Sequence, residues 1–273
     1  MSRIIYYYQT FTSLKPILVD NTVVTHIHLS SIHFGLTADK TPYIHLNDHP
    51  PENNIFDNLW KEINQANQLG IKIILMIGGA GGAFSYLFSD FNTYYELLKN
   101  IILKYKCISG VDLDVEESVS LENISLLIKK IKSDFGDDFI ITMAPISESM
   151  ETDNPGMGGF IYKDLYNSEV GKYIDYFNVQ FYSDFSEEAY LRVINNGYQP
   201  DKIVMGLLSN GKSMSDVKKI IKYLYTKYEE YFGGVYVWEY FNAMSDKENP
   251  YEWALEMKEM MTNNIYSQIC LLS

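Results

Sequence analysis

The chain has 273 residues, which is enough for one large α/β barrel or two ordinary domains, and either would bury a substantial core. Its formal net charge of -13 at pH 7 would repel phosphate backbones and anionic lipid, and its lysines form no basic stripe. We therefore expect neither nucleic acid nor a membrane surface to be a partner. No apolar run approaches the roughly 20 residues that span a bilayer.

The N-terminus passes from Met1 directly into a strand-like run, without an apolar leader or a cleavage site. If Met1 is the natural start, we expect a cytoplasmic protein or one that is released by a non-standard route. Cys107 and Cys270 have neither a metal-binding spacing nor a disulfide framework, so both are expected to be free thiols. We also expect a monomer.

Short runs of β-branched and aromatic residues alternate with longer segments of helical periodicity. This pattern is typical of repeated βα units around a parallel sheet. No composition break or long linker interrupts the series, so a single catalytic domain over residues 1–273 is predicted. Eight runs favour an α/β fold that is a closed (β/α)8 TIM barrel without a large insertion domain. The predicted strands cover residues 3–8, 26–32, 72–77, 111–115, 139–144, 176–181, 202–208 and 234–238.

Helices are predicted between most of these strands. The clearest covers residues 121–135, where apolar residues recur at three- and four-residue steps with lysines between them. The connection around residues 14–18 is too short for a full helix. Residues 35–54 and 147–162 are rich in Pro, Asn, Asp and Gly, and they are predicted to be long loops at the binding rim. The other predicted helices cover residues 55–69, 91–105, 187–195, 216–231 and 251–263.

The most informative segment is Gly110-Val-Asp-Leu-Asp-Val-Glu116. A strand here places Asp112, Asp114 and Glu116 on one face, with successive residues about 6.6 Å apart, which is twice the rise per residue. Carboxylates this close repel each other, so at least one retains its proton to unusually high pH. A carboxyl group with a raised pKa is suited to general acid catalysis.

In a (β/α)8 barrel the active site lies at the carboxyl ends of the strands. Glu116 stands where the fourth predicted strand ends. Side chains at the ends of other strands are expected to converge on the same mouth. These are Met143 of the fifth strand, Gln180 and Tyr182 of the sixth and Trp238 of the eighth.

The segment Gly110-Val-Asp-Leu-Asp-Val-Glu116 resembles the fourth-strand signature Asp-x-x-Asp-x-Asp-x-Glu of family 18 glycoside hydrolases, the chitinases and endo-β-N-acetylglucosaminidases. The resemblance spans most of the chain, because four other strands are also similar. The chain departs from the family pattern at Ser109, Val115 and Met76, which replace the first Asp, the residue before the Glu and the usual third-strand Ser. The other similar segments are Met76-Ile-Gly-Gly79, Thr142-Met-Ala-Pro145, Asn178-Val-Gln-Phe-Tyr182 and Gly234-Val-Tyr-Val-Trp238.

The resemblance implies substrate-assisted retaining hydrolysis, in which the acetamido oxygen of the substrate replaces the nucleophilic carboxylate of other retaining glycosidases. It implies that Glu116 protonates the glycosidic oxygen, that Asp114 orients the acetamido group and that Asp112 tunes Asp114. Tyr182 would donate to the same acetamide, and no metal or cofactor is implied. The expected substrate-binding residues are Trp238, on which the sugar stacks, Gly78 and Gly79, which permit close approach, and Gln180 and Met143.

The implied substrate is chitin or chito-oligosaccharides, cleaved at β-1,4 bonds next to N-acetylglucosamine. The alternative enzyme is an endo-β-N-acetylglucosaminidase that acts on the chitobiose core of N-glycans. A chitinase-like lectin, which binds sugar without cleaving it, is a rival from another class because Ser109 replaces a signature residue. The carboxylates could instead bind Mg²⁺, but ligands for such an ion usually come from several strands, and no further acidic residue ends the fifth or sixth strand.

Overall fold

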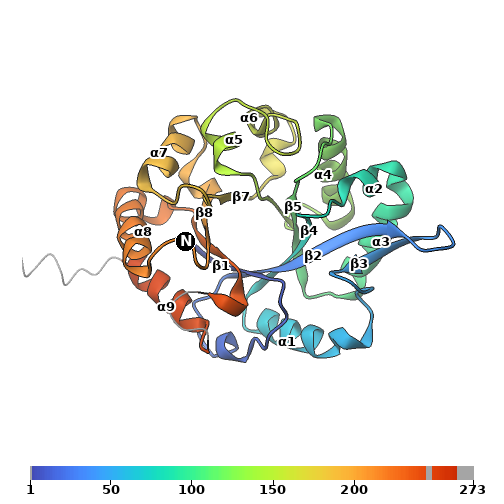
Figure 1. The fold of residues 1–273 in the computed structure, drawn as a ribbon, viewed down its shortest axis with the longest axis horizontal. Helices are drawn as coiled ribbons and strands as arrows, with labels where there is room; N and C mark the ends of the chain where they lie inside the picture. Colours follow the sequence, from blue (N-terminus) through green and yellow to red (C-terminus); the bar gives the residue numbers. More distant parts are fainter. Residues whose placement is uncertain (1, 244–247, 263–273) are drawn as a thin grey trace, which may run out of the picture.

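The computed structural model describes residues 2–243 and 248–262. Parallel strands form a closed barrel in the order β1-β9-β8-β7-β6-β5-β4-β2, and pairing between β1 and β2 closes the ring. Helices surround this ring (Figure 1), so the predicted (β/α)8 fold is confirmed. The barrel strands are β1 (Arg3–Tyr8), β2 (His26–Leu36), β4 (Lys72–Gly78), β5 (Ile108–Asp114), β6 (Ile140–Met143), β7 (Tyr176–Gln180), β8 (Ile203–Leu208) and β9 (Gly234–Trp238).

The helices pack around the outside of the barrel. Helix α4 (Leu121–Phe135) has the predicted bounds, and the Ser120 side chain caps it by accepting a hydrogen bond from the Asn123 amide. After β1 the chain forms a 3₁₀ turn at Lys15–Ile17, and the fully described segment between β8 and β9 contains no inserted domain. The other helices are α1 (Asp57–Gln68), α2 (Phe84–Ser89), α3 (Phe91–Lys104), α5 (Ser147–Glu151), α6 (Tyr162–Asn167), α7 (Glu187–Asn195), α8 (Met214–Tyr228) and α9 (Tyr251–Met260).

Two segments that the sequence predicts to be loops contain regular structure. Within residues 35–54 the chain forms β3 (Pro42–Leu46), which pairs antiparallel with an extension of β2 and projects from the barrel as a hairpin (Figure 1). Within residues 147–162 it forms α5. The loop prediction was wrong at these places because turn-forming residues dominate the local composition, whereas pairing with β2 stabilises β3 through contacts that are not local.

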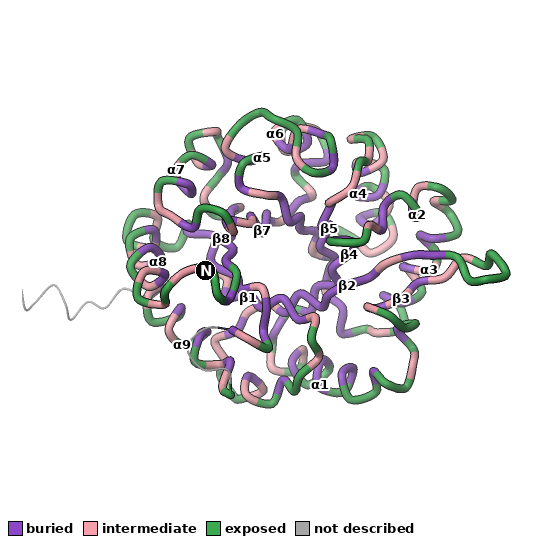
Figure 2. The backbone as a smooth tube through the Cα atoms, in the orientation of Figure 1, coloured by how far each residue is buried: buried purple, intermediate pink, exposed green. Residues whose placement is uncertain are grey.

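Side chains on the two faces of the barrel strands build two apolar cores. The larger core lies between the strands and the helices. Figure 2 shows buried backbone concentrated in the ring of strands and exposed backbone on the surrounding helices and loops. Successive residues of a strand point alternately to the interior and the exterior of the barrel. Interior residues near the carboxyl end of a strand therefore lie at the mouth. The smaller core fills the barrel interior and consists of Ile5, Tyr7, Met76, Tyr176, Val204 and Tyr236.

Two expectations from the sequence concern thiols and membranes. Cys107 is a buried free thiol, whereas Cys270 lies outside the described residues.

The end of the predicted helix over residues 251–263 also lies outside the described residues, and α9 ends at Met260. Within the described part of the chain, no helix has both the length and the apolar character needed to cross a bilayer.

Candidate active site

One cavity of about 170 Å³ lies at the carboxyl ends of the barrel strands. Glu116 and Asp114 line it on one side, and Trp238 lines it as well. Because its walls come from strands that are far apart in the sequence, only the closed barrel brings these side chains together. The predicted site residues that line it are Gly78, Gly79, Asp114, Glu116, Gln180, Tyr182 and Trp238, and the remaining wall consists of Gln9, Ser31, Met76 and Ala80.

Asp112 is completely buried, two residues before Asp114 on the interior face of β5. Its Oδ1 accepts hydrogen bonds from the Thr142 hydroxyl at 2.5 Å and the Asn178 amide at 3.3 Å. Its Oδ2 accepts from the Tyr7 hydroxyl at 2.7 Å, and Nδ1 of His28 lies 3.3 Å from the same oxygen. Burial alone would raise the pKa of Asp112, but His28 and the hydrogen bonds outweigh burial and lower the pKa. Asp112 is therefore an ionised acceptor.

Asp114 is the last residue of β5 and is 5% exposed. Nε2 of Gln180 donates to its Oδ1 at 3.3 Å. Burial, together with the negative charges of Glu116 and Asp112, raises the pKa of Asp114 well above its usual range. Asp114 therefore keeps its proton to a higher pH than an ordinary carboxyl group does.

Glu116 lies two residues beyond the end of β5, is half-buried and lines the cavity. The strand spacing predicts at least one carboxyl group with a raised pKa, and Asp114 is such a group. Asp114 is enclosed by the barrel, whereas Glu116 stands nearer its rim.

Aromatic side chains form the wall opposite β5. The Tyr236 hydroxyl donates to the Tyr182 hydroxyl at 3.1 Å. Burial raises the pKa of Tyr182, so its hydroxyl stays protonated and remains a hydrogen-bond donor. The Trp238 ring lies 5.4 Å from the Tyr7 ring, centroid to centroid, and lines the cavity. A flat apolar surface beside a hydroxyl donor is suited to binding a sugar ring.

Met143 lies elsewhere than its strand position predicts. Met143 is fully buried in the outer core, and Thr142 faces the barrel interior instead. A difference of one residue along a strand turns a side chain to the opposite face, so the structure does not place Met143 with the other site residues. Ser109, at the first position of the carboxylate signature, donates to the Cys107 carbonyl at 3.4 Å.

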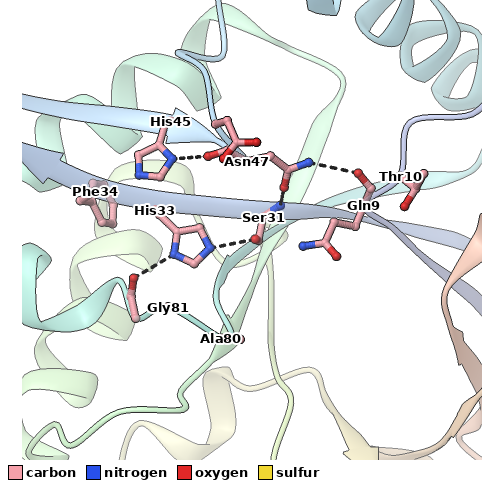
Figure 3. A pocket seen from close by; sticks show the side chains of 11 residues that line it. Gln9, Thr10, Ser31, His33, Phe34, His45, Asn47, Ala80 and Gly81 are labelled. Carbon is pink, nitrogen blue, oxygen red and sulfur yellow. Dashed lines mark hydrogen bonds between the residues drawn. The ribbon is translucent and has the colours of Figure 1, made fainter.

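The cavity continues into an open groove of about 490 Å³. Gln9, Ser31 and Ala80 line both spaces, so the groove and the cavity are contiguous. His33 spans the groove wall, with Nε2 2.9 Å from the Ser31 hydroxyl (Figure 3). Its Nδ1 lies 2.8 Å from the Gly82 carbonyl. Residues 35–54, which the sequence predicts at a binding rim, supply His45 and Asn47 to the groove, whereas Ser31 and His33 were not among the predicted site residues.

The β2–β3 hairpin forms the outer wall of the groove. The His33 and His45 rings stack with centroids 5.6 Å apart. The Asn47 side chain donates to the Gln9 carbonyl at 3.1 Å and accepts from the Ser31 amide at 3.3 Å (Figure 3). The groove therefore presents polar groups that are held in place by contacts with β1 and β2.

A register shift explains why the groove residues on β2 were missed. The pairing between β2 and β4 shifts between Leu29 and Ile32. His28, before the shift, contacts Asp112 in the barrel interior, while Ser31 and His33, after it, line the groove. Simple alternation from His28 would place Ser31 and His33 on the opposite face. The consecutive polar residues Ser30 and Ser31 within an apolar strand were the available signal.

A closed barrel that carries neighbouring carboxyl groups, a tyrosine hydroxyl and a tryptophan at its carboxyl-end mouth has the arrangement of a glycosidase. The family model described as "Glycosyl hydrolases family 18" matches residues 3–264. The chain belongs to glycosyl hydrolase family 18, and the protein is a glycosidase. The resemblance noted in the sequence is confirmed.

Solved structures agree with this assignment. A fungal endo-β-N-acetylglucosaminidase of family 18 is 32% identical, with a TM-score of 0.87 over 97% of this chain and 100% of that chain. The chitinase ChiC from Aspergillus fumigatus is 34% identical, with a TM-score of 0.80 over 96% of this chain and 100% of that chain. The C-terminal domain of Legionella pneumophila ChiA shares the fold at 18% identity, with a TM-score of 0.72 over 97% of this chain and 99% of that chain. The comparison with curated proteins gave no match.

Proposed function

We propose that this glycosidase hydrolyses β-1,4 bonds next to N-acetylglucosamine in chitin or chito-oligosaccharides, by substrate-assisted retaining catalysis. The observation that carries the proposal is the single cavity shared by Asp114, Glu116, Tyr182 and Trp238. It combines an acid for the leaving group, a carboxyl group and a hydroxyl for the acetamide, and a flat surface for the sugar ring.

In the first step, Glu116 donates a proton to the glycosidic oxygen as the bond between that oxygen and the anomeric carbon breaks. The carbonyl oxygen of the acetamido group attacks the anomeric carbon, which closes a five-membered oxazolinium ring. Asp114 accepts the acetamide N–H and stabilises the positive ring, and Tyr182 donates to the acetamide. In the second step, Glu116 takes a proton from a water molecule that attacks the anomeric carbon and reopens the ring, so the configuration is retained.

A protonated Asp114 in the free protein is compatible with this reaction cycle. The negative charge of Glu116 is one of the causes that raise the pKa of Asp114. Asp112 keeps its own charge and opposes ionisation of Asp114 in the free protein. A developing positive charge on the acetamide favours the ionised form of Asp114, which then accepts the acetamide N–H.

The chitobiose core of N-glycans is the second candidate substrate. The solved endo-β-N-acetylglucosaminidase has a TM-score of 0.87 with this chain, compared with 0.80 for the Aspergillus chitinase. The groove next to the cavity also favours this candidate, because His33, His45 and Asn47 offer polar groups to a hydroxyl-rich sugar branch.

Product analysis separates the two substrates. Cleavage of chitin oligomers supports the chitinase reaction, and release of high-mannose glycans from a glycoprotein supports the endo-β-N-acetylglucosaminidase reaction. With a chromogenic chitobioside, Glu116→Gln is expected to lower kcat by about 10²- to 10⁴-fold while binding of chito-oligosaccharides is retained. Sugar binding without turnover by the unsubstituted protein would contradict the proposal and favour the lectin.

A further inference from the structure

One wall of the cavity is the glycine-rich loop of residues 78–82, which starts at the last residue of β4 and leads to α2. The loop lines the cavity at one end and the groove at the other. Its four glycines have φ values between +69° and +102°, which residues with a side chain rarely adopt. Within the loop, the Gly82 amide donates to the Gly79 carbonyl at 3.2 Å. A loop of this kind has little rigidity of its own, so its shape depends on what holds its ends.

Both ends of the loop are held by residues that flank Glu116 in the sequence. At the start, the Gly79 amide donates to the backbone carbonyl of Asp114 at 2.9 Å. Just past the end, the Glu117 carboxylate accepts from three consecutive backbone N–H groups, those of Ala83, Phe84 (2.6 Å) and Ser85 (3.2 Å). Glu117 therefore ties the loop to the segment that carries the acid.

The contact between Glu117 and the loop is close and charged. A Cβ added at Gly82 would lie 2.8 Å from Oε1 of Glu117, so a glycine at this position leaves room for the carboxylate. Burial would raise the pKa of Glu117, but the hydrogen bonds from Ser85, Phe84 and Ala83 outweigh burial and lower it. An ionised acceptor makes stronger hydrogen bonds to backbone N–H groups than a neutral one.

The loop in turn contacts the carboxyl group proposed to bind the acetamide. A Cβ added at Gly79 would lie only 3.2 Å from Oδ2 of Asp114. A displacement of the loop therefore changes the space beside Asp114 and the cavity wall facing Glu116. We propose that Glu117 is a positioning residue of this glycosidase, which fixes the glycine-rich loop and Glu116 relative to each other without touching the substrate. This role rests on the proposed function.

Substitution of Glu117 tests the role. Glu117→Gln keeps the side-chain length but replaces one acceptor oxygen by an N–H donor that faces backbone donors. We expect kcat on a chromogenic chitobioside to fall by about 10- to 100-fold with KM changed much less, because misplacement affects the transition state more than ground-state binding. The matched control is Glu62→Gln. Glu62 is more deeply buried than Glu117 and likewise accepts from a backbone N–H, that of Leu14 at 2.7 Å, and from the Ser13 hydroxyl at 2.8 Å, away from the cavity.

The control separates positioning from general stability. Both variants are expected to melt at a lower temperature than the unsubstituted protein, but Glu62→Gln should keep its kcat. Gly82→Ala disturbs the same contact from the loop side and also strains a backbone with φ of +69°, so its effect and that of Glu117→Ala should be less than additive in a double-mutant cycle. Equal losses of kcat in Glu117→Gln and Glu62→Gln, or additive effects of the two substitutions in the cycle, would overturn the positioning role.

Amide hydrogen exchange measures the contact between Glu117 and residues 83–85 without depending on activity. The N–H groups of residues 83–85 should be protected in the unsubstituted protein and exchange faster in Glu117→Ala. If these N–H groups exchange at the same rate in Glu117→Ala, Glu117 does not hold the loop. If they exchange faster but kcat is unchanged, the contact exists but does not position the catalytic residues. An unsubstituted protein that cleaves neither substrate would contradict the proposed function, whereas exchange at residues 83–85 would still report on the contact between Glu117 and the loop.

Discussion

Tyr7 on β1 donates its hydroxyl hydrogen to Asp112 on β5 at 2.7 Å, across the barrel interior. The hydroxyl of Thr142 and the amide of Asn178 donate to the other oxygen of the same carboxylate. Donors from β1, β6 and β7 therefore converge on one anion. This convergence makes Asp112 both a structural centre of the barrel interior and a fixed negative charge beneath Asp114.

Asp112→Asn is expected to destabilise the barrel. An amide group replaces one acceptor oxygen with a donor, which would face Tyr7 or Thr142 and leave a buried hydroxyl without its acceptor. We expect the free energy of unfolding to fall by about 1 to 3 kcal/mol, measured by urea denaturation at neutral pH. Tyr7→Phe, which removes only one of the donors, should have a smaller effect. Unchanged stability in Asp112→Asn would show that the network does not hold the fold together.

Asp114→Asn is expected to change how stability depends on pH. The pKa of Asp114 is raised by burial and by the charges of Glu116 and Asp112, so the folded protein binds this proton more tightly than the unfolded chain does. The stability contributed by the protonated group is fully present below the unfolded pKa of about 3.9 and is lost as the pH rises through the raised folded pKa. The asparagine side chain cannot ionise, so the Asp114→Asn variant does not lose stability in this way as the pH rises.

The melting temperature of Asp114→Asn, relative to the unsubstituted protein, should therefore increase from pH 4 to pH 8. Thermal melts at several pH values in this range measure the difference. The same variant should lose about 10²- to 10³-fold in kcat, because it lacks the anion that stabilises the oxazolinium. A difference in melting temperature that is constant over this range would mean that Asp114 does not hold its proton in the folded protein.

Tyr182→Phe is expected to weaken catalysis more than it weakens the fold. The substitution removes the hydroxyl proposed to donate to the acetamide, and it leaves the Tyr236 hydroxyl without its acceptor. We expect kcat/KM to fall by about 10- to 100-fold. Tyr236→Phe is the matched control, because it breaks the same hydrogen bond between the tyrosines but leaves the Tyr182 hydroxyl in the cavity. Equal losses in the two variants would argue against a contact between Tyr182 and the substrate.

Trp238→Ala is expected to act mainly on substrate binding. Loss of the flat surface should raise KM for a chito-oligosaccharide by about tenfold or more, since each tenfold corresponds to about 1.4 kcal/mol of binding free energy. Trp238→Phe keeps an aromatic face and should lose less. Steady-state kinetics on the two variants measure the difference. A KM that is unchanged in Trp238→Ala would place the sugar on another surface.

Much of the fold was predictable because its signals are local. The amphipathic pattern of residues 121–135 and the apolar runs that became β1 and β9 depend on neighbours in the chain, and their predicted bounds match. The β2–β3 hairpin was not predictable in this way. Its strand Pro42–Leu46 is short, and its stability comes from pairing with a distant extension of β2.

The site was predictable where a strand end alone determines a side chain's position. Asp114, Glu116, Tyr182 and Trp238 share the cavity, as the strand ends predict. Met143 does not, because the sequence does not specify on which face a four-residue strand begins.

Partners from distant parts of the chain were not predictable. The donors to Asp112 come from other strands, and the contact of Glu117 with residues 83–85 depends on how the loops meet in space. The pKa of Asp114 is raised mainly by burial, and the alternation of residues along a strand does not show how deeply a side chain is buried.

In the proposed mechanism the substrate's acetamido oxygen is the nucleophile and Glu116 is the acid. The most direct test is the rate on a series of aryl chitobiosides whose acetyl methyl group carries zero, one, two or three fluorines. Each fluorine withdraws electrons from the carbonyl oxygen and weakens it as a nucleophile. We expect kcat/KM to fall with every fluorine added, and a rate that does not depend on fluorination would show that the acetamido oxygen is not the nucleophile.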